Sequence, residues 1–276
     1  MAGADGKTPE LRPPSIKGMM RFWWRAINGH LSLEQLRKQE AEIFGTSDES
    51  IGRSKFALKV IYNSDLKTDL YEPVPTRSFK AQAFQPEQAF TLLLSANDNF
   101  KEFEKISHLL QASFILGGLG KRSRRGFGCV KIVQIDGKPD PQYNSINELF
   151  KLLDLSAPDT FVLNGNKIER IKPDHAVAEY PYIKEVDIGK AENSWEILTK
   201  KIGNAASSND CYHTGFTEKP YRFASPVYVS VIKGNNDQYL PIITTLNCAF
   251  EINLNNLRNN QKKKDNTLQF KKAILS

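Results

Sequence analysis

The segment Gly117–Gly128 reads GGLGKRSRRGFG and lies between an apolar helix pattern and a strand pattern. Glycine permits positive φ and removes side-chain bulk, so a second backbone can approach closely. Basic side chains attract phosphate. The segment therefore predicts a loop that grips the backbone of a polyanion from a helix-to-strand junction. Its candidate contacts are Lys121, Arg122, Arg124 and Arg125 through their side chains, and Gly118, Gly120 and Gly126 through the backbone.

Two other interpretations of this loop are a nucleotide-binding P-loop and a solvated surface loop. A P-loop requires a glycine separated by four residues from the Gly-Lys pair, but Ile115 stands at that position and Arg122 follows the lysine. A P-loop also runs from strand to helix, so that class is excluded. A solvated surface loop without function remains open.

The bulk composition fits a soluble globular protein with a lean toward anionic partners. The chain has 276 residues, 40% of them hydrophobic, a formal charge of +7 and a pI near 9.1. Its three cysteines are Cys129, Cys211 and Cys248. A small, odd number of cysteines argues against a disulfide framework and favours a reducing, cytoplasmic setting. No apolar run predicts a membrane span, and no signal peptide is expected.

The first half of the chain alternates helix and strand patterns. Helical spacing is expected over residues 15–27, 32–44 and 99–116, and strands over 55–62, 89–95 and 127–135. Residues 63–87 are expected to be irregular, with Arg77, Phe79 and Lys80 as a second contact to an extended polymer. The order resembles a sheet of the RNA-recognition type that lacks a strand at its start.

The helix over residues 15–27 carries a basic stripe. Lys17, Arg21 and Arg25 recur every four residues, and Trp24 lies beside them. Cations beside an aromatic ring can hold phosphates and stack a base, so these four residues are further candidates for RNA contact. A solvated helix face with a boundary tryptophan is the alternative.

The second half is expected to form another lobe. A helix is predicted over 195–202 and strands over 226–233 and 239–250, joined by a turn at 234–237, whereas the short helix predicted over 145–153 ends the first lobe. Residues 156–190 are expected to cross into this lobe, 205–220 to be mobile, and the lysine-rich tail from Asn255 to be solvated. The expected domains are 1–155 and 156–276.

Five separate segments resemble one family. Pro9–Gly18, reading PELRPPSIKG, precedes Arg21–Ala26, reading RFWWRA; Ile43–Gly45, Gly117–Gly128 and Arg222–Pro226 follow in order. The glycine loop alone is typical of the wider RAMP superfamily. Together with the tryptophan helix, the set resembles the first subunit of the Cmr complex, the type III-B CRISPR RNA-guided effector.

The resemblance implies an α+β fold of two ferredoxin-like lobes, the first lacking its N-terminal strand. It also implies a subunit that caps the effector, holds the 3′ part of the CRISPR RNA and helps to capture target RNA, with the other Cmr subunits as partners. Target cleavage would belong to those subunits. The chain departs from the family near Arg222, where a second arginine is replaced by Tyr221 and Phe223, which weakens the expectation of RNA contact there.

Some RAMP relatives cut RNA with a histidine as the general base, so the histidines of this chain are candidate catalytic residues. His108 fits a packed helix and His30 a helix end, and Cys211 with His213 offers only two of the four ligands that a structural zinc needs. The sequence therefore predicts no catalytic residue, no metal and no cofactor. A metal-independent endoribonuclease and an assembly subunit with little RNA contact remain as rival functions.

Overall fold

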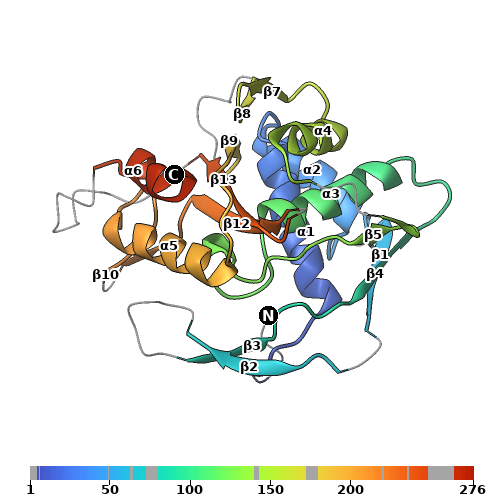
Figure 1. Cartoon of the computed structure of the whole chain (residues 1–276). Helices are drawn as coiled ribbons and strands as arrows, with labels where there is room; N and C mark the ends of the chain where they lie inside the picture. Colours follow the sequence, from blue (N-terminus) through green and yellow to red (C-terminus); the bar gives the residue numbers. More distant parts are fainter. Residues whose placement is uncertain are drawn as a thin grey trace.

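The computed structural model describes residues 5, 7–48, 50–62, 65–72, 80–139, 143–171, 180–218, 221–234, 236–247 and 264–276 (Figure 1). Within these ranges the helices are α1 (Pro13–Ile27), α2 (Leu33–Phe44), α3 (Phe103–Leu116), α4 (Ile146–Ser156), α5 (Trp195–Ser208) and α6 (Thr267–Leu275), with a short 3-10 helix, η1, at Ser123–Arg125.

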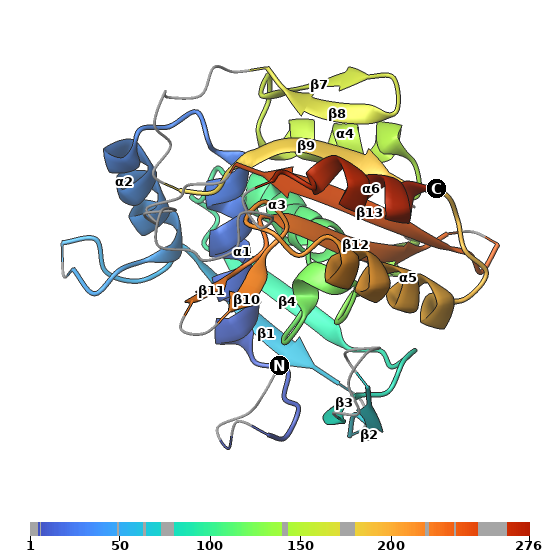
Figure 2. The ribbon, with the colours of Figure 1, turned by 90° about the vertical axis from the view of Figure 1, so that its left-hand side faces the viewer.

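A five-stranded antiparallel sheet forms the middle layer. Its order is β12 (Val227–Lys233), β13 (Tyr239–Leu246), β9 (Ile183–Ile188), β8 (Lys167–Arg170) and β7 (Phe161–Asn164). Figure 2 shows α5 and α6 in front of this sheet and α1, α3 and α4 behind it. The sheet is thus covered by helices on both faces, which explains why β12 and β13 are nearly continuous apolar runs.

Four two-stranded ribbons complete the described structure. They pair β1 (Phe56–Ile61) with β4 (Thr91–Ala96), β2 (Thr68–Tyr71) with β3 (Ala81–Phe84), β5 (Gln134–Ile135) with β6 (Lys138–Pro139), and β10 (Phe216–Glu218) with β11 (Tyr221–Phe223). The ribbon β2–β3 projects from the lower side of the molecule (Figure 1).

The largest hydrophobic cluster joins the two halves of the chain. Trp23 of α1 and Leu116 of α3 share it with Tyr228 and Ile242 of the central sheet. A second cluster lies on the other face, where Phe270 and other residues of α5 and α6 meet the sheet. The predicted domain boundary at 155 and 156 therefore falls inside a continuous core, and the division into 1–155 and 156–276 stays a prediction.

The mixed α+β class is confirmed, as are the helices and most strands. Both ends of α2 carry local sequence signals. At its start Ser32 and Gln35 form a capping box, and at its end Gly45 stops the helix with φ of 77°. The ferredoxin-like arrangement of each lobe remains a prediction.

Several element predictions were wrong. Residues 63–87 contain the ribbon β2–β3, and of 127–135 only Gln134–Ile135 forms a strand. Helix α5 extends to Ser208, into a segment expected to be mobile, and α6 lies in the tail expected to be solvated. Alternation in 127–133 was a valid strand signal, but these residues lack a paired neighbour among the described strands, and a strand requires one.

Candidate nucleic-acid interface

The glycine loop closes on its own backbone. The Leu119 N–H donates to the Gly128 carbonyl at 2.8 Å, and a Cβ added at Gly128, where φ is 69°, would lie 2.0 Å from the Leu119 carbonyl oxygen. A Cβ at Gly118 would lie 2.6 Å from the Phe127 carbonyl oxygen. Glycine is therefore required at these two positions because two parts of the loop's own backbone approach each other closely. The sequence had suggested that the backbone of a bound polyanion would make this close approach.

The loop lies along the open edge of β12. The Gly126 N–H donates to the Val229 carbonyl at 2.7 Å, and the Val231 N–H donates to Cys129 Sγ at 3.2 Å. Arg125 donates to the Val227 carbonyl at 3.0 Å. Three alternate residues of the strand thus receive partners from the loop, which covers the edge of the sheet without being a strand itself.

Arg125 is the main anchor of this arrangement. Its guanidinium donates to Ser225 Oγ at 3.1 Å and to the Thr214 carbonyl at 2.6 Å, in addition to Val227, and it stacks 5.2 Å from the centre of the Phe270 ring. Burial, with the nearby charges of Arg122 and Arg124, lowers the pKa of Arg125 to about 10. The side chain is directed into the protein, so the predicted phosphate contact through Arg125 is not supported by this geometry.

Arg124 links the loop to the same part of the chain. It donates to the Ser225 carbonyl at 2.6 Å and lies 4.7 Å from the centre of the Tyr228 ring. The glycine loop and the segment Arg222–Pro226, which are about a hundred residues apart in sequence, therefore meet at Ser225. The sequence showed both segments as anchors of one resemblance but gave no sign that they contact each other.

The tip of the loop faces outward. Lys121 is exposed, and Gly120 beside it has φ of 87°. Arg122 adopts the left-handed conformation with φ of 62° and is half-buried, 5.9 Å from the centre of the Phe127 ring. The loop is thus divided into an inward pair, Arg124 and Arg125, and a tip pair, Lys121 and Arg122.

The predicted basic stripe of α1 is real but is largely engaged within the chain. Lys17 donates to the Phe56 carbonyl at 3.1 Å, and burial together with the charge of Arg21 lowers its pKa. Arg21 donates to the Phe44 carbonyl at 2.9 Å and pairs with Glu40 at 3.2 Å. Arg25 pairs with the other oxygen of Glu40 at 3.5 Å. These cations join α1 to α2 and β1, although Arg25 remains partly exposed.

Trp24 does not lie on that stripe as a stacking platform. Its side chain is 7% exposed and belongs to the main core, with its ring centre 6.4 Å from that of Phe44. The predicted base-stacking role of Trp24 is therefore contradicted by its burial. The i, i+4 pattern identified the faces of α1, but a tryptophan at their boundary fits either side until its neighbours are known.

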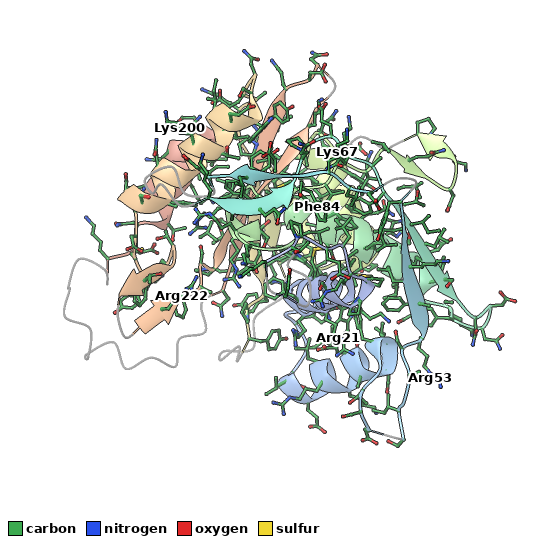
Figure 3. The ribbon with its side chains drawn as sticks, turned by 90° about the horizontal axis from the view of Figure 1, so that it is seen from below. Arg21, Arg53, Lys67, Phe84, Lys200 and Arg222 are labelled. Atoms are coloured by element: carbon green, nitrogen blue, oxygen red, sulfur yellow. The ribbon has the colours of Figure 1, made fainter. Side chains whose placement is uncertain are left out.

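Further exposed cations lie on the side of the molecule seen in Figure 3. Lys200 of α5 and Arg222 of β11 appear on one side of the view, and the ribbon β2–β3 lies in front of the centre. Lys80, next to β3, is also exposed, whereas Arg77 and Phe79 fall outside the described residues. Arg222 is the middle residue of the short strand β11 and lies opposite Thr217 of β10.

The sequence did not indicate two polar residues that fix the end of α1. Arg170 donates to the Ala26 and Ile27 carbonyls at 3.0 and 2.8 Å, and Tyr180 donates to the Leu31 carbonyl at 2.7 Å. Both reach the end of α1 from the second half of the chain. The bonds of Arg170 satisfy carbonyls that a helix end leaves without partners, and the bond of Tyr180 holds the turn that follows the helix.

No cluster of three or more potential metal ligands occurs in the described part of the chain. Cys211 is buried with its thiol 3.3 Å from Thr214 Oγ1, and His213 lies 3.9 Å from Asp265. His108 is half-buried in α3, and burial lowers its pKa, in keeping with the predicted packing role. His175 lies outside the described residues. None of the described helices is both long and apolar enough to cross a membrane.

Comparisons with known proteins agree with this architecture. The family model of the RAMP superfamily matches residues 1–131. The Cmr subunit Cmr1-1 of Pyrococcus furiosus is 26% identical over 285 residues, covering 88% of this chain and 82% of that protein. Cmr1-2 of the same organism is 25% identical over 168 residues, covering 48% of this chain and 88% of that protein.

Two solved structures share the fold. The apo crystal structure of Cmr1 from Pyrococcus furiosus has a TM-score of 0.58 at 21% identity and covers 96% of this chain and 89% of that chain. The cryo-EM structure of the type III-B Cmr-beta complex bound to cognate target RNA contains a chain with a TM-score of 0.55 at 14% identity, covering 96% of this chain and 92% of that chain. Together with the family model, these findings confirm the resemblance: residues 1–131 match the RAMP superfamily, and the chain is similar to the Cmr1 subunits over most of its length.

Proposed function

We propose that this chain is a noncatalytic RNA-binding subunit of a type III-B CRISPR effector, which holds the 3′ part of the CRISPR RNA and contributes to the capture of target RNA. The similarity to Cmr1-1 over most of both chains supports the assignment to the effector. The observation that carries the RNA-binding role is the division of the glycine loop, in which Arg124 and Arg125 hold the loop against Ser225 while Lys121 is left exposed at the tip.

The division matters because a phosphate contact is stronger when the cation is already in place. A free loop loses conformational entropy when it binds, whereas the contacts to Ser225, Val227 and Val229 have already ordered this one. Lys121 and Arg122 then contribute through release of counterions from the RNA. Such contacts do not read sequence, so target choice would come from base pairing by the guide RNA.

The test is the binding of single-stranded RNA across a salt series. The tip variant carries Lys121→Ala and Arg122→Asn, because asparagine tolerates the left-handed conformation of residue 122. The matched control carries Lys131→Ala and Lys138→Ala, which removes two exposed cations outside the loop. We expect the tip variant to lower the slope of log affinity against log salt by about 0.7 for each lost phosphate contact, and the control to leave it unchanged.

Equal slopes for the native chain, the tip variant and the control would contradict the role of the tip. Weak binding by the native chain with a shallow slope would favour an assembly subunit instead. The same samples are run on a denaturing gel, where discrete products lost on replacing one histidine would favour an endoribonuclease.

A further inference from the structure

The hairpin formed by β10 and β11 has two unlike faces. Phe216 lies opposite Phe223, and their rings stack with centres 6.1 Å apart. Phe216 is buried and also meets Tyr212, with ring centres 4.9 Å apart, so this face is turned into the protein. Side chains alternate along a strand, so Arg222, which lies opposite Thr217, belongs to the other face. Both of these polar residues are exposed. The hairpin therefore holds its arginine outward on an aromatic base.

The hairpin is joined to the glycine loop at Ser225. Arg124 donates to the Ser225 carbonyl at 2.6 Å, and Arg125 donates to Ser225 Oγ at 3.1 Å. Ser225 follows Arg222 by three residues, which extended chain spans in at most about 11 Å. Lys121 precedes Arg124 by the same number of residues, so the same limit applies to it. The exposed loop tip and the exposed arginine are thus tied to one junction from its two sides.

Other arginines lack this connection to the loop. Arg21 is engaged by Glu40 at 3.2 Å and joins α1 to α2. Arg53 is exposed, but Figure 3 shows it on the opposite side of the view from Arg222. Arg222 combines exposure with a position that the contacts at Ser225 fix relative to the loop.

We infer that Arg222 is a second phosphate contact, so that the glycine loop and the β10–β11 hairpin form two parts of one RNA-binding surface. This inference rests on the proposed function. The guanidinium matches a phosphate with two parallel donors, and the hydroxyl of Thr217 beside it can donate to the same backbone. Because Ser225 already orders both parts, less conformational entropy is lost on binding. Arg124 is a positioning residue here, since it donates to the Ser225 carbonyl.

The test is the binding of single-stranded RNA to the full chain across a salt series. We expect Arg222→Gln to lower the slope of log affinity against log salt by about 0.7, the value for one phosphate contact to a single strand. The matched control, Arg53→Gln, removes the same charge on the opposite side of Figure 3 and should leave the slope unchanged. Arg124→Met should weaken the affinity at a fixed salt concentration without changing the slope, because it loosens the junction and removes no phosphate contact.

Each outcome separates this inference from the proposed function. An unchanged slope in Arg222→Gln, with a lower slope in the tip variant, would overturn the inference and leave the proposed function standing. Equal losses of slope in Arg222→Gln and Arg53→Gln would also overturn it, because the effect would then be one of net charge. A lower slope in Arg124→Met, or an unchanged affinity, would refute the positioning role. A shallow slope in the native chain would contradict the proposed function and this inference together.

Discussion

Arg125 should contribute more to stability than any other cation of the glycine loop. Arg125→Ala removes the donor to the carbonyls of Thr214 and Val227, two residues that are 1% and 0% exposed. Ser225 Oγ also donates to the Val227 carbonyl at 2.8 Å, so the substitution leaves the Thr214 carbonyl, and not that of Val227, without a described donor. An unsatisfied buried acceptor costs about 1–3 kcal/mol, and the lost contact with the Phe270 ring adds to this cost. Burial lowers the pKa of the guanidinium to about 10 and so disfavours its charged form, which offsets part of the stability that Arg125 contributes. We expect a net loss of about 2 kcal/mol.

The measurement is thermal and urea unfolding of the full chain, followed by circular dichroism. A loss of about 2 kcal/mol corresponds to a fall in Tm of about 4–8 °C for a chain of this size. Arg125→Lys keeps the charge but cannot bond several acceptors in one plane, so it should recover less than half of the loss. Arg222→Ala, which removes an exposed arginine of the same region, should change stability by less than about 0.5 kcal/mol. An Arg125→Ala variant as stable as Arg222→Ala would refute the anchoring role.

Two further substitutions test the packing of the loop and of α6. Gly128→Ala should destabilise the chain by at least about 2 kcal/mol in urea unfolding, because the residue has φ of 69° and the added Cβ would lie 2.0 Å from the Leu119 carbonyl oxygen; an unchanged midpoint would show that the loop is not held in this form. Lys271 is nearly buried and pairs with Glu185 and Asp187 at 2.5 Å each, so Lys271→Met should cost about 3 kcal/mol near pH 7. Burial already raises the pKa of Asp187, and removal of Lys271 should raise the pKa of both carboxyl groups. The folded variant then binds protons more readily than the unfolded chain, so its deficit relative to the native chain should shrink as pH falls from about 7 to about 5; a deficit that grows on acidification would contradict this pairing.

The helices were predictable because their signals are local. Ser32 and Gln35 form a capping box within four residues, and Ile16, Met20 and Trp23 mark one face of α1 by spacing alone. The strand expected at 127–135 failed for the opposite reason. Its alternation is correct, with Val130 and Ile132 inward, but pairing is a long-range property that alternation does not encode.

In the candidate site, too, the contacts between distant parts of the chain could not be predicted from local sequence patterns. Composition identified Gly117–Gly128 as a cationic glycine loop, but it could not separate the inward Arg124 and Arg125 from the outward Lys121. That separation depends on Ser225, about a hundred residues away. The only available signal was that Arg222–Pro226 accompanied the loop in the same family resemblance. Glycines that suggested an external partner proved to be required by the loop's own closure.

In the proposed function, the tip of the glycine loop contacts RNA while its inner arginines hold the loop in place. The most direct measurement is photo-crosslinking of the full chain to a guide-length RNA carrying 4-thiouridine at single positions near the 3′ or the 5′ end, with adducts located by mass spectrometry. We expect adducts on the peptide around Lys121 and Arg122, stronger from the 3′ positions, and their loss in the tip variant that keeps the native Tm. Adducts that avoid the loop, or that persist unchanged in the tip variant, would contradict it.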